Sequence, residues 1–252
     1  MFQNIAKDFE DGKNPYEDVE LNKNAKIREI LKKCFNKQMV LLYIVSFLLS
    51  FVSFGTNKEL APFGIAILAA ILSNCIPIGI ASILVIIGTS VSLGGSATLN
   101  LLLSLLLVFV SILIKSPKYD EESNEKRKLG LRLFVSCMIV QIVPLIFKEM
   151  MIYDILFTFI YSISAYIFYK IFVNGITVIS NLGQARIYSI EEVMSASLLV
   201  AIGVCGIGNQ MIFGYSIRNI LCILIVLIMG WKNGILVGAT AGVTIGSVVG
   251  II

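Results

Sequence analysis

Histidine is absent from this sequence of 252 residues, and charged residues are few. Histidine is the commonest metal ligand and the commonest general base at neutral pH, so its absence removes the usual starting point for both kinds of site. Only 14% of the residues are charged, whereas an ordinary soluble domain has about 25%. Because a chain of this size folded in water needs a polar exterior, the composition argues against a soluble enzyme.

Patterned cysteine is also lacking. The five cysteines are scattered without the C-x-x-C spacing of a zinc or redox site: Cys34, Cys75, Cys137, Cys205 and Cys222. Four of them lie in or beside apolar segments, where cysteine usually packs as a small hydrophobe. The sequence therefore predicts no disulfide framework, and we expect no catalytic residue, metal site or cofactor in this chain.

Apolar residues make up 57% of the chain and follow one another in long runs from residue 39 onward. A transmembrane helix needs about 20 apolar residues, with a range of about 17 to 25. We identify nine runs: Met39–Gly55, Ala61–Asn74, Ile76–Leu93, Leu99–Ile114, Leu131–Phe147, Ile152–Val173, Val193–Ile207, Ile217–Met229 and Gly234–Ile252. The predicted fold is an all-α, multi-pass transmembrane bundle over residues 39–252, after a cytoplasmic tail of residues 1–38. Residues 61–93 would either cross twice or form a re-entrant pair.

The basic residues predict how these runs are oriented. With the amino terminus in the cytoplasm and every run crossing, the outer side keeps only Lys58, Lys148 and Arg218. Membrane proteins carry their excess of Lys and Arg on the cytoplasmic side, so the distribution favours this orientation. An odd number of crossings would leave Ile252 outside. Either the chain ends there or a tenth helix belongs next.

The net charge of +4 does not indicate nucleic-acid binding, because the basic residues form no stripe with interleaved aromatics. Just before the first run, apolar residues at 27, 30, 31, 34 and 35 recur at helical spacing. The basic residues around them are Lys26, Arg28, Lys32, Lys33 and Lys37. This pattern predicts an amphipathic helix on the anionic inner leaflet, either as a topology anchor or with a lipid-specific role. The mixed charges of residues 115–132 predict a solvated connector.

Glycine recurs at every fourth residue in the last run: Gly234, Gly238, Gly242, Gly246 and Gly250. Residues four apart share one face of a helix, so a neighbouring helix can approach this face closely. Packing within one bundle, self-association between copies and a substrate path would all use such a face.

Ser189 and Glu192 have the spacing of a capping box, which predicts that a helix begins there. The adjacent Glu191 lies about 100° around the helix from Glu192, so the two carboxylates do not form an acid–base pair. The glycine-rich stretch Gly203–Gly208 lacks the Lys-Ser/Thr of a phosphate loop, and we interpret it as a helix end and turn.

Several of these features together resemble a known family. They are the Ser-x-Glu-Glu start at Ser189, the Gly203–Gly208 turn, Gly214-x-Ser216-x-x-Asn219 and the Gly-Ala-Thr-x-Gly-x-Thr-x-Gly run from Gly238. Residues 188–252 resemble the membrane region of the stage II sporulation protein E family of endospore-forming bacteria, and Ala61-Pro-Phe-Gly64 is a weaker match.

The resemblance implies about ten transmembrane helices, followed by a cytoplasmic linker and a manganese-dependent serine/threonine phosphatase domain. That phosphatase would dephosphorylate an anti-anti-sigma factor and so release the first forespore sigma factor. The family gathers at the asymmetric division septum with the tubulin-like division protein. Because the sequence stops at Ile252, no phosphatase or manganese-binding residue can be assigned to it, and the resemblance implies a membrane anchor and assembly module.

Two other functions are compatible with the sequence. Many helices, the interrupted segment at residues 61–93 and the glycine-rich break at Gly203–Gly208 are also typical of a small-solute transporter or its membrane subunit. The lack of histidine and the scarcity of deeply placed carboxylates count against it. An intramembrane enzyme would need a nucleophile paired with an activating group, and no such set is visible.

Overall fold

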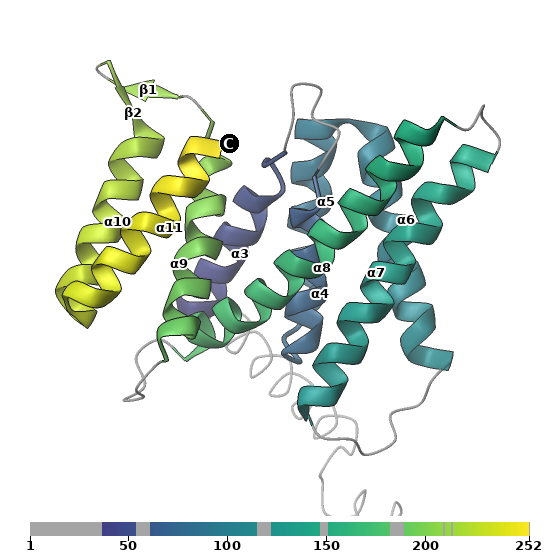
Figure 1. Cartoon of the computed structure of the whole chain (residues 1–252), viewed down its shortest axis with the longest axis horizontal. Helices are drawn as coiled ribbons and strands as arrows, with labels where there is room; N and C mark the ends of the chain where they lie inside the picture. Colours follow the sequence, from purple (N-terminus) through teal and green to yellow (C-terminus); the bar gives the residue numbers. More distant parts are fainter. Residues whose placement is uncertain are drawn as a thin grey trace, which may run out of the picture. The chain divides into compact units, whose positions relative to one another are not determined.

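The computed structural model describes residues 37–53, 61–114, 122–146, 151–181, 189–208, 210–212 and 214–251 (Figure 1). Two units are distinguished, Met1–Val40 and Leu41–Ile252, and every contact discussed below lies within the second unit. The helices in the described ranges are α3 (Lys37–Leu49), α4 (Phe63–Ser73), α5 (Ile78–Leu93), α6 (Gly95–Ile114), α7 (Glu122–Ile146), α8 (Ile152–Ser180), α9 (Ile190–Cys205), α10 (Ile217–Asn233) and α11 (Ile235–Ile251). A short antiparallel hairpin, β1 (Met211–Ile212) and β2 (Tyr215–Ser216), precedes α10.

Each predicted apolar run overlaps one of these helices, so the predicted helical bundle is confirmed. Helices α6, α7 and α8 have 20, 25 and 29 residues and are apolar and long enough to cross a membrane. The other helices in the described ranges have 11 to 17 residues. At about 1.5 Å per residue, they are shorter than a hydrocarbon core of about 30 Å. Nine crossings therefore stay a prediction.

Helix α8 lies at the centre of the packing, because it contacts α4, α7 and α9. Helix α7 also contacts α6, and α6 contacts α5. Beyond α9, helix α11 packs against both α9 and α10 (Figure 1). Helices adjacent in sequence and helices far apart in sequence (α4 with α8, α9 with α11) both pack together, and α8 and α9 join the two groups of helices.

Helix α4 is enclosed by protein. Every residue from Phe63 to Ile71 is buried, and the helix contacts α5, α6, α7 and α8. The ring of Phe63 packs against that of Phe168 of α8, with 4.6 Å between the ring centroids. A helix that is apolar on all sides and also surrounded by other helices belongs to the interior of a bundle.

The turn after α4 has the hydrogen bonds of a Schellman motif. The amide of Ile76 donates to the carbonyl of Ile71 at 3.3 Å, and that of Cys75 donates to Leu72 at 3.2 Å. Cys75 has a φ of 55° and so adopts the left-handed conformation that this motif requires. The side-chain amide of Asn74 donates to the Ala70 carbonyl at 3.0 Å. Residues 61–93 thus form two separate helices joined by a tight turn.

Helix α3 lies between α5 and α9, and glycines allow both close approaches. A β-carbon on Gly88 of α5 would collide with the Ser50 side chain, and one on Gly206 would collide with the carbonyl oxygen of Leu48. Small residues let helix backbones approach closely in a membrane, where packing supplies much of the attraction. The predicted turn at Gly203–Gly208 is therefore also a packing site for α3.

The predicted connector is wrong for residues 122–132, because α7 begins at Glu122; residues 115–121 lie outside the described residues. Glu, Lys and Arg are good helix formers, so a charged segment can extend a helix beyond its apolar part. Helix α8 likewise continues past the predicted end at Val173 to Ser180. The hydroxyl of Thr177 donates to the carbonyl of Asn174 at 2.6 Å, so polar residues there bond within the helix. Hydropathy therefore predicted the limits of the apolar part of each helix, whereas α7 begins before that part and α8 ends after it.

Candidate functional site

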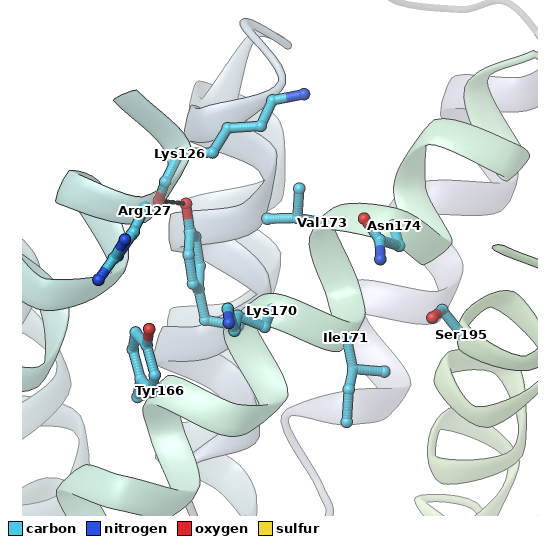
Figure 2. A pocket seen from close by; sticks show the side chains of 9 residues that line it. Lys126, Arg127, Tyr166, Lys170, Ile171, Val173, Asn174 and Ser195 are labelled. Carbon is cyan, nitrogen blue, oxygen red and sulfur yellow. Dashed lines mark hydrogen bonds between the residues drawn. The ribbon is translucent and has the colours of Figure 1, made fainter. Parts of the chain in front are cut away.

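Three cationic side chains of the described residues line a pocket that is formed by α7, α8 and α9. Gly130 of α7 brings that helix against two aromatic rings of α8. A β-carbon on Gly130 would lie 2.8 Å from ring atoms of both Tyr166 and Tyr169. The Tyr169 hydroxyl donates to the carbonyl oxygen of Lys126 at 2.8 Å, which joins the charged first turns of α7 to α8 (Figure 2).

A second glycine brings α9 to the other side of α8. A β-carbon on Gly175 would lie 3.0 Å from the carbonyl oxygen of Ser195, so glycine permits this approach. Helix α8 is therefore in close contact with α7 at Gly130 and with α9 at Gly175. The pocket is the space left between them.

The pocket has a volume of about 480 Å³. Its lining residues are Lys126, Arg127, Tyr166, Tyr169, Lys170, Ile171, Val173, Asn174 and Ser195. Figure 2 shows Lys126 and Arg127 on the α7 side, Tyr166 and Lys170 on α8, and Ser195 across from them on α9. The Lys170 ammonium lies 5.7 Å from the centroid of the Tyr166 ring, at the distance of a cation–π contact. Three cations from two helices thus line one hollow.

An adjoining pocket of about 520 Å³ shares Lys126 and Asn174 with the first. Its other lining residues are Asn74, Ile76, Thr177, Ser180, Asn181 and Glu192. The side-chain amide of Asn74 donates to the Val173 carbonyl at 3.4 Å, and this hydrogen bond connects the α4–α5 turn to α8. Most of the side chains here are neutral hydrogen-bonding groups, in contrast to the cations of the first pocket.

Ser189 and Glu192 form the predicted capping box at the start of α9. The Glu192 amide donates to the Ser189 hydroxyl at 3.2 Å, and the Ser189 amide donates to the Glu192 carboxylate at 2.9 Å. Both bonds satisfy amides that a helix start leaves without intrahelical partners. Glu192 therefore acts at this helix start and also borders the polar pocket.

The periodic glycines of the last run have different surroundings. A β-carbon on Gly238 would lie 2.7 Å from the Cα atom of Gly230 in α10, and one on Gly242 would lie 3.4 Å from Val226. Gly246 and Gly250 have no such neighbour within 4 Å among the described residues. Gly234 precedes α11 and caps the end of α10, with a φ of 89°. The stripe therefore packs against α10 at one end and is open at the other.

Of the basic residues predicted to lie on an amphipathic helix, Lys26, Arg28, Lys32 and Lys33 lie outside the described residues. Lys37 is the first residue of α3. The sequence analysis did not predict the pocket that Lys126, Arg127 and Lys170 share. Tyr166, Lys170 and Asn174 recur at every fourth residue, and this spacing is the signal that could have placed them on one face of α8.

In the described part of the chain, no group of three or more His, Cys, Asp or Glu side chains is placed to hold a metal ion. In a comparison with protein families, the family described as "SpoIIE, N-terminal domain" matches residues 4–252. No curated protein and no solved structure matches the chain.

Proposed function

The chain belongs to the SpoIIE N-terminal domain family, and from that membership we propose that it anchors and assembles a sporulation phosphatase at the membrane. The observation that carries this proposal is the family match over residues 4–252, which includes every described helix. This domain is the non-catalytic part of its family and is a sporulation-linked membrane module. The domain then contributes by positioning the phosphatase at the membrane and not by catalysing a reaction.

The catalytic part of the proposed system is a manganese-dependent serine/threonine phosphatase domain carried on the same polypeptide beyond residue 252. This phosphatase acts on an anti-anti-sigma factor, and dephosphorylation activates the forespore sigma factor. The membrane module holds it at the asymmetric septum, where it meets the tubulin-like division protein. These steps follow from the family resemblance of residues 188–252, and manganese belongs to the phosphatase.

The proposed orientation places the amino terminus in the cytoplasm. Of the basic residues that follow α3, Lys58, Lys148 and Arg218 would face outward, whereas the charged first turns of α7 would face inward. This bias is the one that cytoplasmic loops of membrane proteins carry. A single cysteine at position 118 of a cysteine-free chain should react with a membrane-impermeant maleimide only after the cells are permeabilised. Labelling in intact cells would contradict the orientation.

Localisation tests the anchoring role directly. The chain carries a fluorescent protein at its amino terminus and is expressed in a sporulating bacterium that lacks its own family member. We expect fluorescence to gather at the asymmetric septum. An unrelated multi-pass membrane protein with the same fusion should stay spread over the cell membrane and serves as the control. If the two distributions were the same, the septal role would be excluded.

A further inference from the structure

The pocket lined by Lys126, Arg127 and Lys170 lies at a definite depth if α8 crosses as proposed. Helix α8 has 29 residues and is about 43 Å long at about 1.5 Å per residue. The hydrocarbon core is about 30 Å thick, so about 20 residues counted from the outer end at Ile152 reach its inner boundary near Lys170. The charged turn of α7 that holds Lys126 and Arg127 precedes the apolar part of that helix, which begins at Leu131. Two helices thus place cations at the level of the inner headgroups.

We propose that this pocket binds a phosphate group. The planar guanidinium of Arg127 can donate two parallel hydrogen bonds to phosphate oxygens, and the Lys170 ammonium supplies a compact positive charge. Asn174 and Ser195 also line the pocket, on the side away from Arg127 in Figure 2. Lys126 completes the cationic side, and its backbone is held in place by the hydrogen bond from Tyr169. The site requires no metal and no chemical step.

Two sources can present this phosphate, namely an anionic phospholipid of the inner leaflet and a small phosphorylated solute of the cytoplasm. Basic pockets between transmembrane helices on the cytoplasmic side bind lipid headgroups in this way. Ile171 and Val173 also line the pocket and offer an apolar wall beside the cations. The proposal rests on the proposed orientation, because only an inner position places the pocket beside the cytoplasm and the inner leaflet.

The test uses the full chain, purified in an uncharged detergent at fixed ionic strength. Dioleoyl phosphatidylglycerol is titrated in one arm and inorganic phosphate in the other, with dioleoyl phosphatidylcholine as the neutral comparison. Binding is read by native mass spectrometry and by the shift in melting temperature. The pocket variant is Arg127→Gln with Lys170→Gln. The control variant is Arg132→Gln with Lys128→Gln, which removes the same charges from α7 positions that do not line the pocket.

We expect the pocket variant to weaken binding of the successful probe about 25-fold, or about fivefold for each charge removed. The control variant should weaken it less than about twofold, and Lys170→Arg, which keeps the charge at that position, should retain most of the binding. Preference for phosphatidylglycerol over phosphatidylcholine, lost in the pocket variant, assigns a lipid. Binding of inorganic phosphate, lost in the same variant, assigns a soluble ligand.

Equal weakening by the pocket and control variants would overturn the site, because it would show diffuse attraction to surface charge. So would the failure of both probes to bind the unaltered chain. The two proposals fail separately. A chain that is labelled at position 118 only after permeabilisation and gathers at the septum, but binds neither probe, overturns the pocket alone. Labelling at position 118 in intact cells overturns the orientation, whatever binding is seen in detergent.

Discussion

Helices α4 and α11 have similar sequences and different surroundings. Both are short, carry no charged residue and consist mainly of small and branched aliphatic residues. In α4 every residue from Phe63 to Ile71 is buried, whereas the buried positions among the described side chains of α11 are Gly238, Ala241 and Ile245. The difference lies in the neighbours, since α4 contacts four helices and α11 packs against α9 and α10.

This comparison shows what hydropathy measures in a membrane protein. A lipid-facing side chain and a protein-facing one are both apolar, so the sequence alone does not tell an enclosed helix from a half-open one. Close packing differs between the two, because only the enclosed helix has neighbouring atoms on all sides. Substitutions that change packing while keeping apolar character should therefore separate α4 from α11.

The largest effect should come from shortening a leucine. Leu68 in α4 is fully buried, with 0% of its surface exposed, whereas Leu236 in α11 is 63% exposed. Leu68→Ala leaves a cavity among packed helices and should cost about 2 to 5 kcal/mol of unfolding free energy. Leu236→Ala should cost less than about 0.5 kcal/mol. Unfolding of both variants in the same detergent gives the values, and similar costs would show that α4 is not enclosed.

A second contrast lies within α11 itself. Gly238→Leu would force α10 and α11 apart at Gly230, and we expect it to cost about 1 to 3 kcal/mol. Gly246→Leu adds the same side chain where no described residue lies within 4 Å of the new β-carbon, so stability should change little. Thermal unfolding measures both, and sedimentation of the two variants reports self-association. Loss of association in Gly246→Leu with unchanged stability would assign the open end of the stripe to contacts between copies. Equal destabilisation would contradict the packing described here.

The sequence predicted the helices well because long apolar runs have few other interpretations. A helix overlaps each predicted run, and the Ser189 capping box marks the start of α9 at the expected residue. The prediction failed where polar segments are helical, because hydropathy does not identify a polar helix. The charged segment 122–132 is helical, and α8 continues through polar residues to Ser180. The hairpin of β1 and β2 was also missed, since each strand has only two residues.

The basic pocket needed tertiary contacts that no local pattern supplies. Lys126 and Lys170 are 44 positions apart in the sequence, and they line one pocket because Gly130 lets α7 approach the rings of Tyr166 and Tyr169. A single glycine inside a charged helical segment does not predict such a contact. Its role becomes visible only when the opposing helix is known.

The turns that lead into α5 and α11 both contain a residue with a positive φ, Cys75 in the first and Gly234 in the second. Gly234, between α10 and α11, has φ 89° and ψ 173°, a region that is open almost only to glycine. Gly234→Ala should therefore cost about 1 to 3 kcal/mol. As a control, Gly246→Ala introduces the same methyl group within the helix and should be neutral or stabilising by up to about 1 kcal/mol. The two melting temperatures should move in opposite directions, and a parallel shift would contradict the turn geometry.

The corresponding turn after α4 uses Cys75, a residue with a β-carbon, at φ 55°. The left-handed conformation costs a residue other than glycine about 1 to 2 kcal/mol, and a change to glycine would remove this cost. The greater conformational freedom of glycine in the unfolded chain would offset about 0.5 to 1 kcal/mol of that stabilisation. Cys75→Gly should therefore stabilise the chain by about 0.5 to 1 kcal/mol. Cys75→Ala removes the thiol and keeps the β-carbon, so its unfolding free energy should stay near that of the unaltered chain. The difference between these two variants isolates the backbone contribution, and equal stability of the pair would show that Cys75 is not held in the left-handed conformation.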